Sequence, residues 1–211
     1  MNEIFNEDYF ERGLESGLSC YSNYRWLHKQ TIMACGAIIK FAEIEKEHTL
    51  LDFGASKGFY VKGFLELGIE SWGWDISKYA VDNCHPDVKD RMTLLDMNQS
   101  FPKNRWYDWV LAKDVLEHLA IDKMRIFLKD IPAPRGYFII PLGLGNRFND
   151  PRNNMDITHK LCMPAWWWGL EILKERWTII KYAEEVPGLK QAWATKDAYG
   201  HFICRRLGET R

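Results

Sequence analysis

Between residues 48 and 142 the sequence alternates regularly between short apolar segments and amphipathic segments, and this alternation constrains the fold most. The apolar segments are typical of β-strands, and the last of them, GYFIIPL, is apolar throughout, as a strand covered on both faces should be. Strands that alternate with helices pair in parallel through right-handed crossovers. We therefore predict an α/β fold built on a mostly parallel sheet.

The expected elements follow from apolar spacing and from start and stop signals. Strands are predicted in 48–54, 71–75, 91–96, 107–114 and 136–142, with two closing strands in 177–183 and 199–207. Helices are predicted in 24–47, 59–68, 78–84, 123–131 and 164–175. Ser77 and Asp122 are placed to cap helices, and Gly68 is placed to end one. Residues 143–160 form a long loop rich in Gly, Asn, Asp and Pro, and loops of this length usually carry function.

The composition narrows the class of protein. The chain has 211 residues and 46% hydrophobic residues, which fits one globular domain over 1–211. Its formal net charge of −1 argues against coating nucleic acid or an anionic membrane. The acidic N-terminus does not resemble a signal peptide, and no apolar run could span a bilayer, so a cytoplasmic protein is expected. The five cysteines lack C-x-x-C spacing, so no metal site is predicted.

The stretch LLDFGASKG, residues 50–58, runs from a predicted strand into a loop with Gly54 and Gly58. In open α/β sheets ligands bind beyond the carboxyl ends of the strands, and glycine there lets a ligand approach the backbone. Such a loop is also an ordinary strand-to-helix turn. Asp75 ends the second strand about 20 residues after Gly54, where a carboxylate can accept both hydroxyls of a ribose. Asp96 ends the third strand, and Lys113 and Asp114 follow the fourth.

These motifs together resemble those of class I S-adenosylmethionine-dependent methyltransferases of the small-molecule, type 11 or 12 kind. LLDFGASKG looks like their first motif, GWDIS the second, LLDMN the third, and YDWVLAKDVLEHL the fourth-strand signature. The resemblance covers roughly residues 48–142. It implies a Rossmann-like three-layer sandwich with a seven-stranded sheet and an antiparallel last strand. The sequence departs from the family at Ser56, where the family usually has its middle glycine.

The resemblance also implies roles for single residues. Asp52, Gly54, Ser56 and Gly58 would hold the methionine end of S-adenosylmethionine. Asp75 would bind the ribose and Ile76 would pack on the adenine, while Asp96 would meet the adenine amino group beside Met97. Lys113 and Asp114 would face the sulfonium. The residues expected to close over the cofactor, within a helical lid formed by residues 1–47, are Tyr21, Tyr24, Arg25 and Trp26.

The acceptor side is less clearly marked. Asp156 and His159 lie three residues apart and could act as a general base with its orienting carboxylate, or as a helix cap and a surface histidine. His118 is expected to pack the loop after the fourth strand. Residues 143–170 would form the acceptor-side loop and helix. The three tryptophans at 166–168 cannot all face inward, and they suit either a pocket wall or a homodimer interface.

Small-molecule methylation is the function that these features favour. The sequence lacks both the Asn/Asp-Pro-Pro-aromatic motif of nucleic-acid amino-methyltransferases and an appended RNA-binding segment. Two alternatives stay open: a non-catalytic, partner-activating subunit on the same fold, and methylation of RNA or protein. An NAD-dependent oxidoreductase is disfavoured, because Gly-x-Gly-x-x-Gly would need glycine where Ser56 and Phe59 stand.

Overall fold

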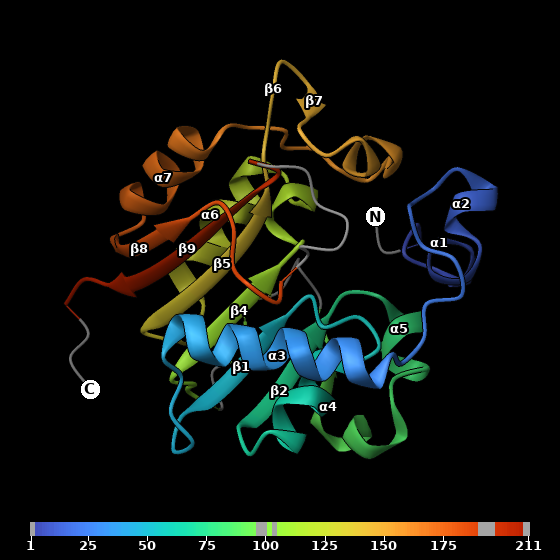
Figure 1. Cartoon of the computed structure of the whole chain (residues 1–211), viewed down its shortest axis with the longest axis horizontal. Coiled ribbons are helices and arrows are strands. Elements are labelled where there is room, and N and C mark those ends of the chain that lie inside the picture. The colour runs from blue at the N-terminus through green and yellow to red at the C-terminus, as the bar shows by residue number, and fades with distance from the viewer. Residues whose placement is uncertain (1–2, 96–100, 103–104, 190–196, 209–211) are drawn as a thin grey trace.

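The computed structural model describes residues 3–95, 101–102, 105–189 and 197–208. Its centre is a seven-stranded sheet in the order β3-β2-β1-β4-β5-β9-β8 (Figure 1). The strands are β1 Thr49–Phe53, β2 Glu70–Asp75, β3 Met92–Leu94, β4 Trp109–Lys113, β5 Arg135–Pro141, β8 Trp177–Ala183 and β9 Tyr199–Arg206. The first five pair in parallel, and β9 runs antiparallel to β5 and to β8. The predicted sheet, with its antiparallel last strand, is confirmed.

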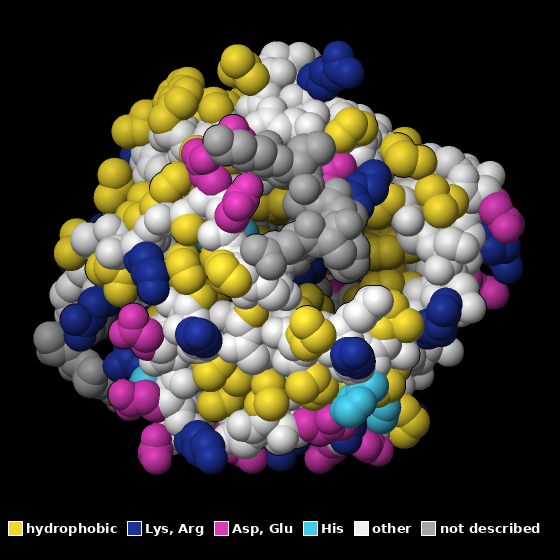
Figure 2. Space-filling view, viewed as in Figure 1, with side chains coloured by type: hydrophobic (Ala, Val, Ile, Leu, Met, Phe, Trp, Pro, Cys, Tyr) yellow, Lys and Arg dark blue, Asp and Glu magenta, His cyan; other side chains and the backbone are white. Residues whose placement is uncertain are grey.

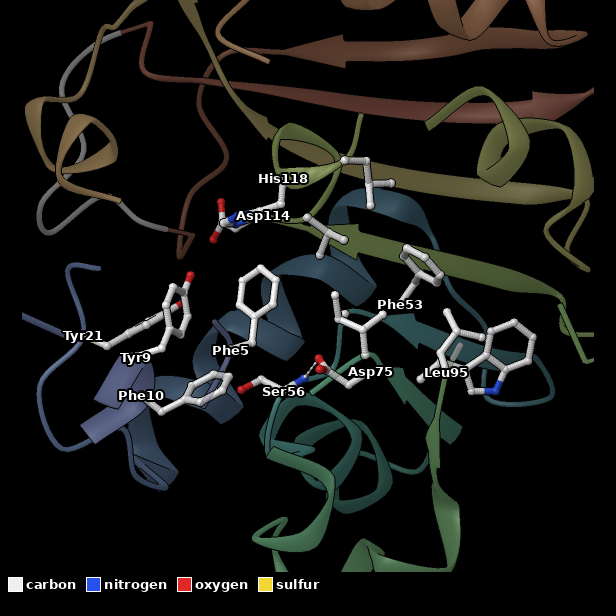
Figure 3. Close-up of a pocket in the computed structure, with 15 residues that line it drawn as sticks. Phe5, Tyr9, Phe10, Tyr21, Phe53, Ser56, Asp75, Leu95, Asp114 and His118 are labelled. Atoms are coloured by element: carbon white, nitrogen blue, oxygen red, sulfur yellow. Dashed lines mark hydrogen bonds between the residues drawn. The ribbon is translucent and has the colours of Figure 1, made fainter. Parts of the chain in front are cut away.

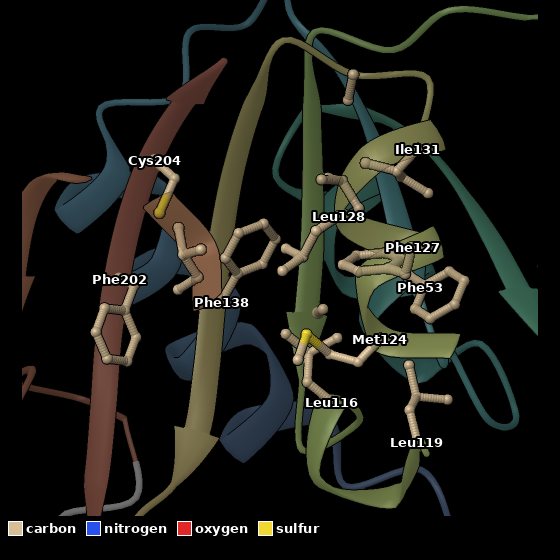
Figure 4. Packing of buried hydrophobic residues seen from close by; sticks show 14 of the residues in the cluster. Phe53, Leu116, Leu119, Met124, Phe127, Leu128, Ile131, Phe138, Phe202 and Cys204 are labelled. Carbon is tan, nitrogen blue, oxygen red and sulfur yellow. The ribbon is translucent and has the colours of Figure 1, made fainter. Parts of the chain in front are cut away.

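Helices cover both faces of the sheet, as the alternation of elements predicts. One face carries α3 His28–Ala42 and α4 Phe59–Glu66, and the other carries α6 Ile121–Asp130 and α7 Ala165–Lys174. Successive residues of β1 point to opposite faces, so Leu50 joins the cluster under α3 while Leu51 joins the cluster under α6. Figure 4 shows the second cluster, with Phe127 and Leu128 packed against Phe138.

The helix ends follow the sequence signals in part. Ser77 caps α5 Lys78–Asp82 as predicted, because its hydroxyl accepts the Ala80 N–H at 2.9 Å. Gly68 lies just beyond α4 with a φ of +83°, a conformation that favours glycine. The predicted Asp122 cap is wrong: Ala120 precedes α6 without a side-chain cap, and Asp122 lies inside the first turn. The predicted helix over 24–47 is shorter, beginning at His28 and ending at Ala42.

Two segments lie beyond the carboxyl ends of the parallel strands. The N-terminal segment contains α1 Glu7–Glu11 and α2 Gly13–Ser16. The segment after β5 contains a hairpin of β6 Gly143–Leu144 and β7 Arg147–Phe148, followed by the 3₁₀ helix η3 Pro151–Met155, so the predicted loop over 143–160 has structure of its own. The two segments touch, since the Ile157 N–H donates to the Leu18 carbonyl at 3.2 Å.

The tryptophans of α7 divide as expected. Trp168 is fully buried in the core, whereas Trp166 is 66% exposed. Trp166, Leu170 and Leu173 are all exposed at helical spacing, and hydrophobic side chains gather over α7 and β8 in Figure 2. Within the described residues, every helix is too short or too polar to cross a membrane.

Candidate functional site

The carboxyl ends of β1, β2 and β4 meet at one edge of the sheet. Their register pairs Phe53 of β1 with Trp74 of β2 and with Ala112 of β4, so the residues that follow these strands lie side by side. A pocket opens there, which we call the inner pocket. It is lined by Phe5, Tyr9, Phe10, Tyr21, Phe53, Gly54, Ser56, Trp74, Asp75, Ile76, Leu95, Asp114, Val115, His118 and Leu119 (Figure 3). The strand tips thus converge on one site, as the sequence predicts.

The glycine-containing loop has two positions where a side chain would not fit. Gly54 has a φ of +80°, and a Cβ there would lie 2.4 Å from a methyl group of Val115. Gly58 has a φ of +71°, and a Cβ there would lie 2.8 Å from Val88. Only Gly54 of the two lines the inner pocket. The shape of the loop therefore depends on both glycines, but only Gly54 is placed to contact a ligand in the inner pocket.

Ser56 has a backbone conformation that favours glycine. Its φ is +53°, in the left-handed region that non-glycine residues rarely adopt. Its hydroxyl oxygen is buried beside the Tyr24 phenol without a well-aligned hydrogen bond. Ser56 therefore accommodates a left-handed backbone conformation and adds a polar group to the lining of the inner pocket.

Asp75 is the buried acid of the inner pocket. One carboxylate oxygen accepts the Ser56 N–H at 2.6 Å and the other accepts the Ser77 N–H at 2.7 Å (Figure 3). Burial raises the pKa of Asp75 to about 6 despite these hydrogen bonds, which favour the ionised form. A carboxylate that is held rigidly by two backbone amides and faces a largely apolar pocket is suited to accept hydrogen bonds from ligand hydroxyls.

A second group of charges lies at the ends of β1 and β4. Lys113 donates to the Asp114 carboxylate at 2.7 Å, and both residues line a second pocket. Burial alone would lower the pKa of Lys113, but Asp114 and neighbouring tyrosines raise it well above its ordinary value. Burial raises the pKa of Asp52 to about 7, although Lys113 opposes the shift. Asp52 lines neither pocket.

Aromatic side chains of the N-terminal segment form the opposite wall of the inner pocket. Phe5, Tyr9, Phe10 and Tyr21 face Phe53 and Leu95 across it (Figure 3). The remaining free volume is about 90 Å³. Ligand pockets usually measure about 300–1,000 Å³, so a nucleoside enters this pocket only if the aromatic wall moves outward.

The second pocket, which we call the outer pocket, is larger. Its volume is about 860 Å³, and it shares Tyr21, Asp114 and His118 with the inner pocket. It is lined by Cys20, Tyr21, Ser22, Asn23, Tyr24, Arg25, Leu27, Gln30, Thr31, Met33, Ala34, Phe59, Tyr60, Lys113, Asp114, Glu117, His118, Arg152, Asn153, Asp156, His159, Gly188 and Tyr199. The predicted residues Tyr24, Arg25, Asp156 and His159 all lie here. The two pockets therefore adjoin, and we treat them as two compartments of one candidate site.

The predicted pair of Asp156 and His159 does not form. The Asp156 carboxylate accepts the Tyr9 hydroxyl at 2.6 Å, the Thr158 N–H at 2.9 Å and the Thr158 hydroxyl at 2.5 Å. His159 instead donates from Nδ1 to the Asn153 carbonyl at 2.7 Å, and its Nε2 lies 3.9 Å from Glu117. The carboxylate beside His159 is therefore Glu117, while Asp156 joins the N-terminal segment to the segment after β5.

Several residues of the site were not predicted from the sequence. Phe5, Tyr9 and Phe10 line the inner pocket, and Glu117 lines the outer one. His118, expected only to pack its loop, lines both pockets, and burial together with His159 lowers its pKa to about 4. The run of Asp-Val-Leu-Glu-His after β4 was the signal that could have identified Glu117 and His118.

The remaining predicted residues have mixed outcomes. Ile76 lines the inner pocket. Asp96 and Met97 lie outside the described residues, although Leu95, which precedes them, lines the inner pocket. Trp26 lines neither pocket and packs against Phe59. The individual roles of these residues toward a ligand stay predictions.

Comparisons with known proteins identify the domain and the fold that carry this site. Residues 51–140 match the family model described as a methyltransferase domain. No curated protein sequence matches the chain. Magnesium protoporphyrin IX methyltransferase of Synechocystis PCC 6803, solved with bound S-adenosylmethionine, has a similar structure: the TM-score is 0.62 at 13% identity, with 97% of this chain and 96% of that chain covered.

Two further solved structures share the fold. A methyltransferase in complex with the Haloferax volcanii activator Trm112 gives a TM-score of 0.66 at 11% identity over 87% of this chain and 92% of that chain. Mitomycin 7-O-methyltransferase gives a TM-score of 0.59 at 15% identity over 85% of this chain, which spans 54% of the mitomycin enzyme. The resemblance seen in the motifs is thus confirmed: residues 51–140 match a methyltransferase-domain model, and the chain has the fold of solved S-adenosylmethionine-dependent methyltransferases.

Proposed function

We propose that this protein transfers a methyl group from S-adenosylmethionine to a small-molecule acceptor. The observation that carries the proposal is the division of one site into two adjoining compartments. Apolar surface predominates in both compartments; the inner one holds the rigid carboxylate of Asp75, and the outer one is lined by more charged side chains and has a volume of about 860 Å³. The first suits an adenosyl group and the second has room for a small acceptor.

The residues of the inner pocket fit the cofactor. Asp75 is buried and held by two backbone amides, which suits it to bind the ribose hydroxyls, with Ile76 and Leu95 against the adenine. Gly54 and Ser56 would lie at the methionine end, with Lys113 and Asp114 at the border of the outer pocket. S-adenosylmethionine supplies an activated methyl group on a sulfonium. The task of the protein is then to orient the acceptor and exclude water, and such positioning can contribute about 7–11 kcal/mol.

The outer pocket favours a small acceptor over nucleic acid. The cations that line it within the described residues are Arg25, Lys113 and Arg152. Two of them are already paired, Lys113 with Asp114 and Arg152 with Asp150. Phosphate backbones are bound by rows of unneutralised lysines and arginines, and this lining does not offer such a row. Residues 1–47 would act as the lid and residues 143–170 as the acceptor-side wall, with the Tyr9–Asp156 hydrogen bond joining them.

A turnover screen tests the acceptor class. Release of S-adenosylhomocysteine is measured with panels of small phenols, alcohols, amines and carboxylic acids, and in parallel with RNA and with peptides. The proposal expects turnover with at least one small-molecule class and its loss in Asp75→Ala. Turnover with RNA or peptides alone would contradict it, as would S-adenosylhomocysteine binding without turnover on any substrate, which is the behaviour of a non-catalytic subunit.

The expected homodimer and cytoplasmic location stay predictions. The exposed stripe of Trp166, Leu170 and Leu173 on α7 gives the dimer a surface that can be tested. Light scattering coupled to size-exclusion chromatography would give a dimer mass for the wild type and a monomer mass for Leu170→Glu. A monomer mass for the wild type would contradict the predicted homodimer.

A further inference from the structure

Three potential metal ligands converge at the wall of the outer pocket. Glu117 and His118 belong to the 3₁₀ helix η2 Leu116–His118, which follows β4, and His159 comes from the segment after η3. The Glu117 Oε1 atom lies 3.9 Å from Nε2 of His118 and 3.9 Å from Nε2 of His159, and the three ligand atoms all lie within 4.8 Å of one another. We propose that Glu117, His118 and His159 bind one divalent transition-metal ion.

Hydrogen bonds on the far sides of both imidazole rings fix how the rings point. His159 donates from Nδ1 to the Asn153 carbonyl at 2.7 Å. The Thr158 hydroxyl gives its only hydrogen to Asp156, so it must accept from His118 Nδ1, 2.7 Å away. Each ring therefore carries its proton on Nδ1 and presents the lone pair of Nε2 toward Glu117. Histidines that bind metals are oriented by this kind of hydrogen bond.

The spacing of the three ligand atoms suits an ion better than direct hydrogen bonds. A hydrogen bond between nitrogen and oxygen spans about 2.7–3.2 Å, so the 3.9 Å separations are too long for one. Metal–ligand distances of about 2.0–2.2 Å place the ligand atoms of a tetrahedral ion about 3.3–3.6 Å apart. To hold an ion, the cluster therefore has to contract by about 0.5 Å at the two 3.9 Å separations and by up to about 1.5 Å between the two imidazoles.

The chemical identity of the three ligand groups indicates which metal ions would bind. Two imidazoles and one carboxylate are typical of zinc sites that keep an open position and of non-haem iron(II) sites. Magnesium and calcium prefer oxygen ligands alone. The spacing of the cysteines predicts no metal site, whereas these three ligands come from two segments that are more than 40 residues apart.

The position of the cluster indicates what the ion would do. Glu117, His118 and His159 all line the outer pocket, so the coordination positions left open by three protein ligands face the space assigned to the acceptor. His118 also lines the inner pocket, next to Asp114 in Figure 3. This second step rests on the proposed function: an acceptor with a hydroxyl group would bind the ion through oxygen, and coordination would lower the pKa of that hydroxyl.

Direct metal binding tests the site. The purified chain is stripped with a chelator and then titrated with Zn²⁺ by calorimetry and with Co²⁺ by visible absorption. We expect one ion per chain, and at least a 100-fold loss of affinity in His159→Ala and in Glu117→Gln. Thr158→Val should weaken binding about 10–100-fold by freeing the His118 ring. His28→Ala, which removes an exposed histidine paired with Glu66, is the matched control and should bind as the wild type does.

S-adenosylhomocysteine binding separates the two proposals. A His159→Ala variant that binds S-adenosylhomocysteine like the wild type must be folded. A loss of metal affinity in that variant would therefore support the metal site. Equal Zn²⁺ affinity in the wild type and in His159→Ala would overturn the site, and so would the absence of Zn²⁺ and Co²⁺ binding in the wild type. Loss of S-adenosylhomocysteine binding with metal binding intact would refute the proposed function and leave the metal site standing. If His159→Ala does not fold, the comparison is made with Glu117→Gln and Thr158→Val.

Discussion

The two walls of the site are built in different ways. The strand-tip wall, with Gly54, Asp75 and Asp114, follows directly from β1, β2 and β4, and hydrogen bonds of the sheet backbone fix its position. The opposite wall consists of the N-terminal segment and the segment after β5. A side-chain hydrogen bond between Tyr9 and Asp156, 147 residues apart in sequence, joins these segments.

Because the two walls are built differently, they suit different tasks in ligand binding. A wall made by sheet backbone keeps its shape with or without a ligand, which suits the binding of an invariant cofactor. A wall that lies outside the sheet, and is joined by single hydrogen bonds such as Tyr9 to Asp156 and Ile157 to Leu18, can open. Ligand entry requires this, because the free volume of the inner pocket is only about 90 Å³. The following predictions test whether the two walls behave separately.

Replacement of Asp75 should have the largest effect. Asp75→Ala removes a carboxylate suited to two ribose hydroxyls, and hydrogen bonds to charged groups contribute about 1.5–3 kcal/mol each. The affinity for S-adenosylhomocysteine, measured by calorimetry, should fall at least about 100-fold. Asp82→Ala, at an exposed ion pair with Lys78, is the control and should leave the affinity unchanged. Wild-type affinity in Asp75→Ala would remove Asp75 from the binding site.

Loss of the Tyr9 hydroxyl should loosen only the opposite wall. Tyr9→Phe leaves Asp156 without one buried hydrogen bond, which should lower the free energy of unfolding by about 1.5–3 kcal/mol in urea denaturation. Tyr79→Phe loses a more exposed bond to Glu11 and should cost less. An equal cost in the two variants would show that the Tyr9–Asp156 bond does not join the segments in solution.

The buried carboxylate of Asp52 should make stability depend on pH. Its pKa in the folded protein is about 7, well above its ordinary value, so the folded state binds the proton more tightly than the unfolded state does. Stability should therefore fall as pH rises from about 4 to about 7. Asp52→Asn should reduce this slope and raise the free energy of unfolding at pH 8 by about 1–3 kcal/mol. A slope that is unchanged in Asp52→Asn would contradict the assignment.

Cofactor affinity should also depend on pH. Asp75 accepts hydrogen bonds from ligand hydroxyls more strongly when it is ionised than when it is protonated, and its pKa is about 6. The affinity for S-adenosylhomocysteine should be constant above pH 7 and fall by up to about tenfold per pH unit below 6. In Asp75→Asn this dependence should disappear. A pH profile that is the same in both proteins would assign the effect to another group.

Ser56 should have the smallest effect. Its φ of +53° costs a serine more than a glycine, so Ser56→Gly should keep or raise the free energy of unfolding, by at most about 1 kcal/mol. Ser56→Ala keeps the strained backbone and provides the control for loss of the hydroxyl. A lower S-adenosylhomocysteine affinity in both variants would show that the hydroxyl contacts the cofactor, and unchanged affinity in both would exclude that contact.

The two walls also differ in how far the sequence predicted them. The strand-tip wall was predicted because its residues follow strands with clear apolar patterns, and parallel pairing brings the ends of those strands together. Asp75 and Gly54 could thus be assigned to one site from their spacing. Asp122 was predicted wrongly because helix caps depend on the local path of the chain, and Ala120 already begins the turn.

The opposite wall was predicted poorly because its contacts are long-range. Asp156 and His159 were predicted to pair because they lie three residues apart in the sequence. In the folded chain Asp156 instead accepts a hydrogen bond from Tyr9, and Glu117 lies beside His159. No local pattern links Tyr9 to Asp156 or Glu117 to His159. Tyr21 and Tyr24 were correctly placed at the site only through the resemblance to methyltransferases, which carries information about tertiary structure that spacing lacks.

The central claim is that the strand tips of this chain bind one adenosyl cofactor. Calorimetric titration of the purified chain with S-adenosylhomocysteine tests it most directly. The account predicts saturable binding of one molecule per chain, with a dissociation constant of about 1–100 µM, in the lower part of the range common for enzyme ligands. A folded chain that shows neither heat of binding nor a rise in melting temperature at millimolar ligand would contradict it.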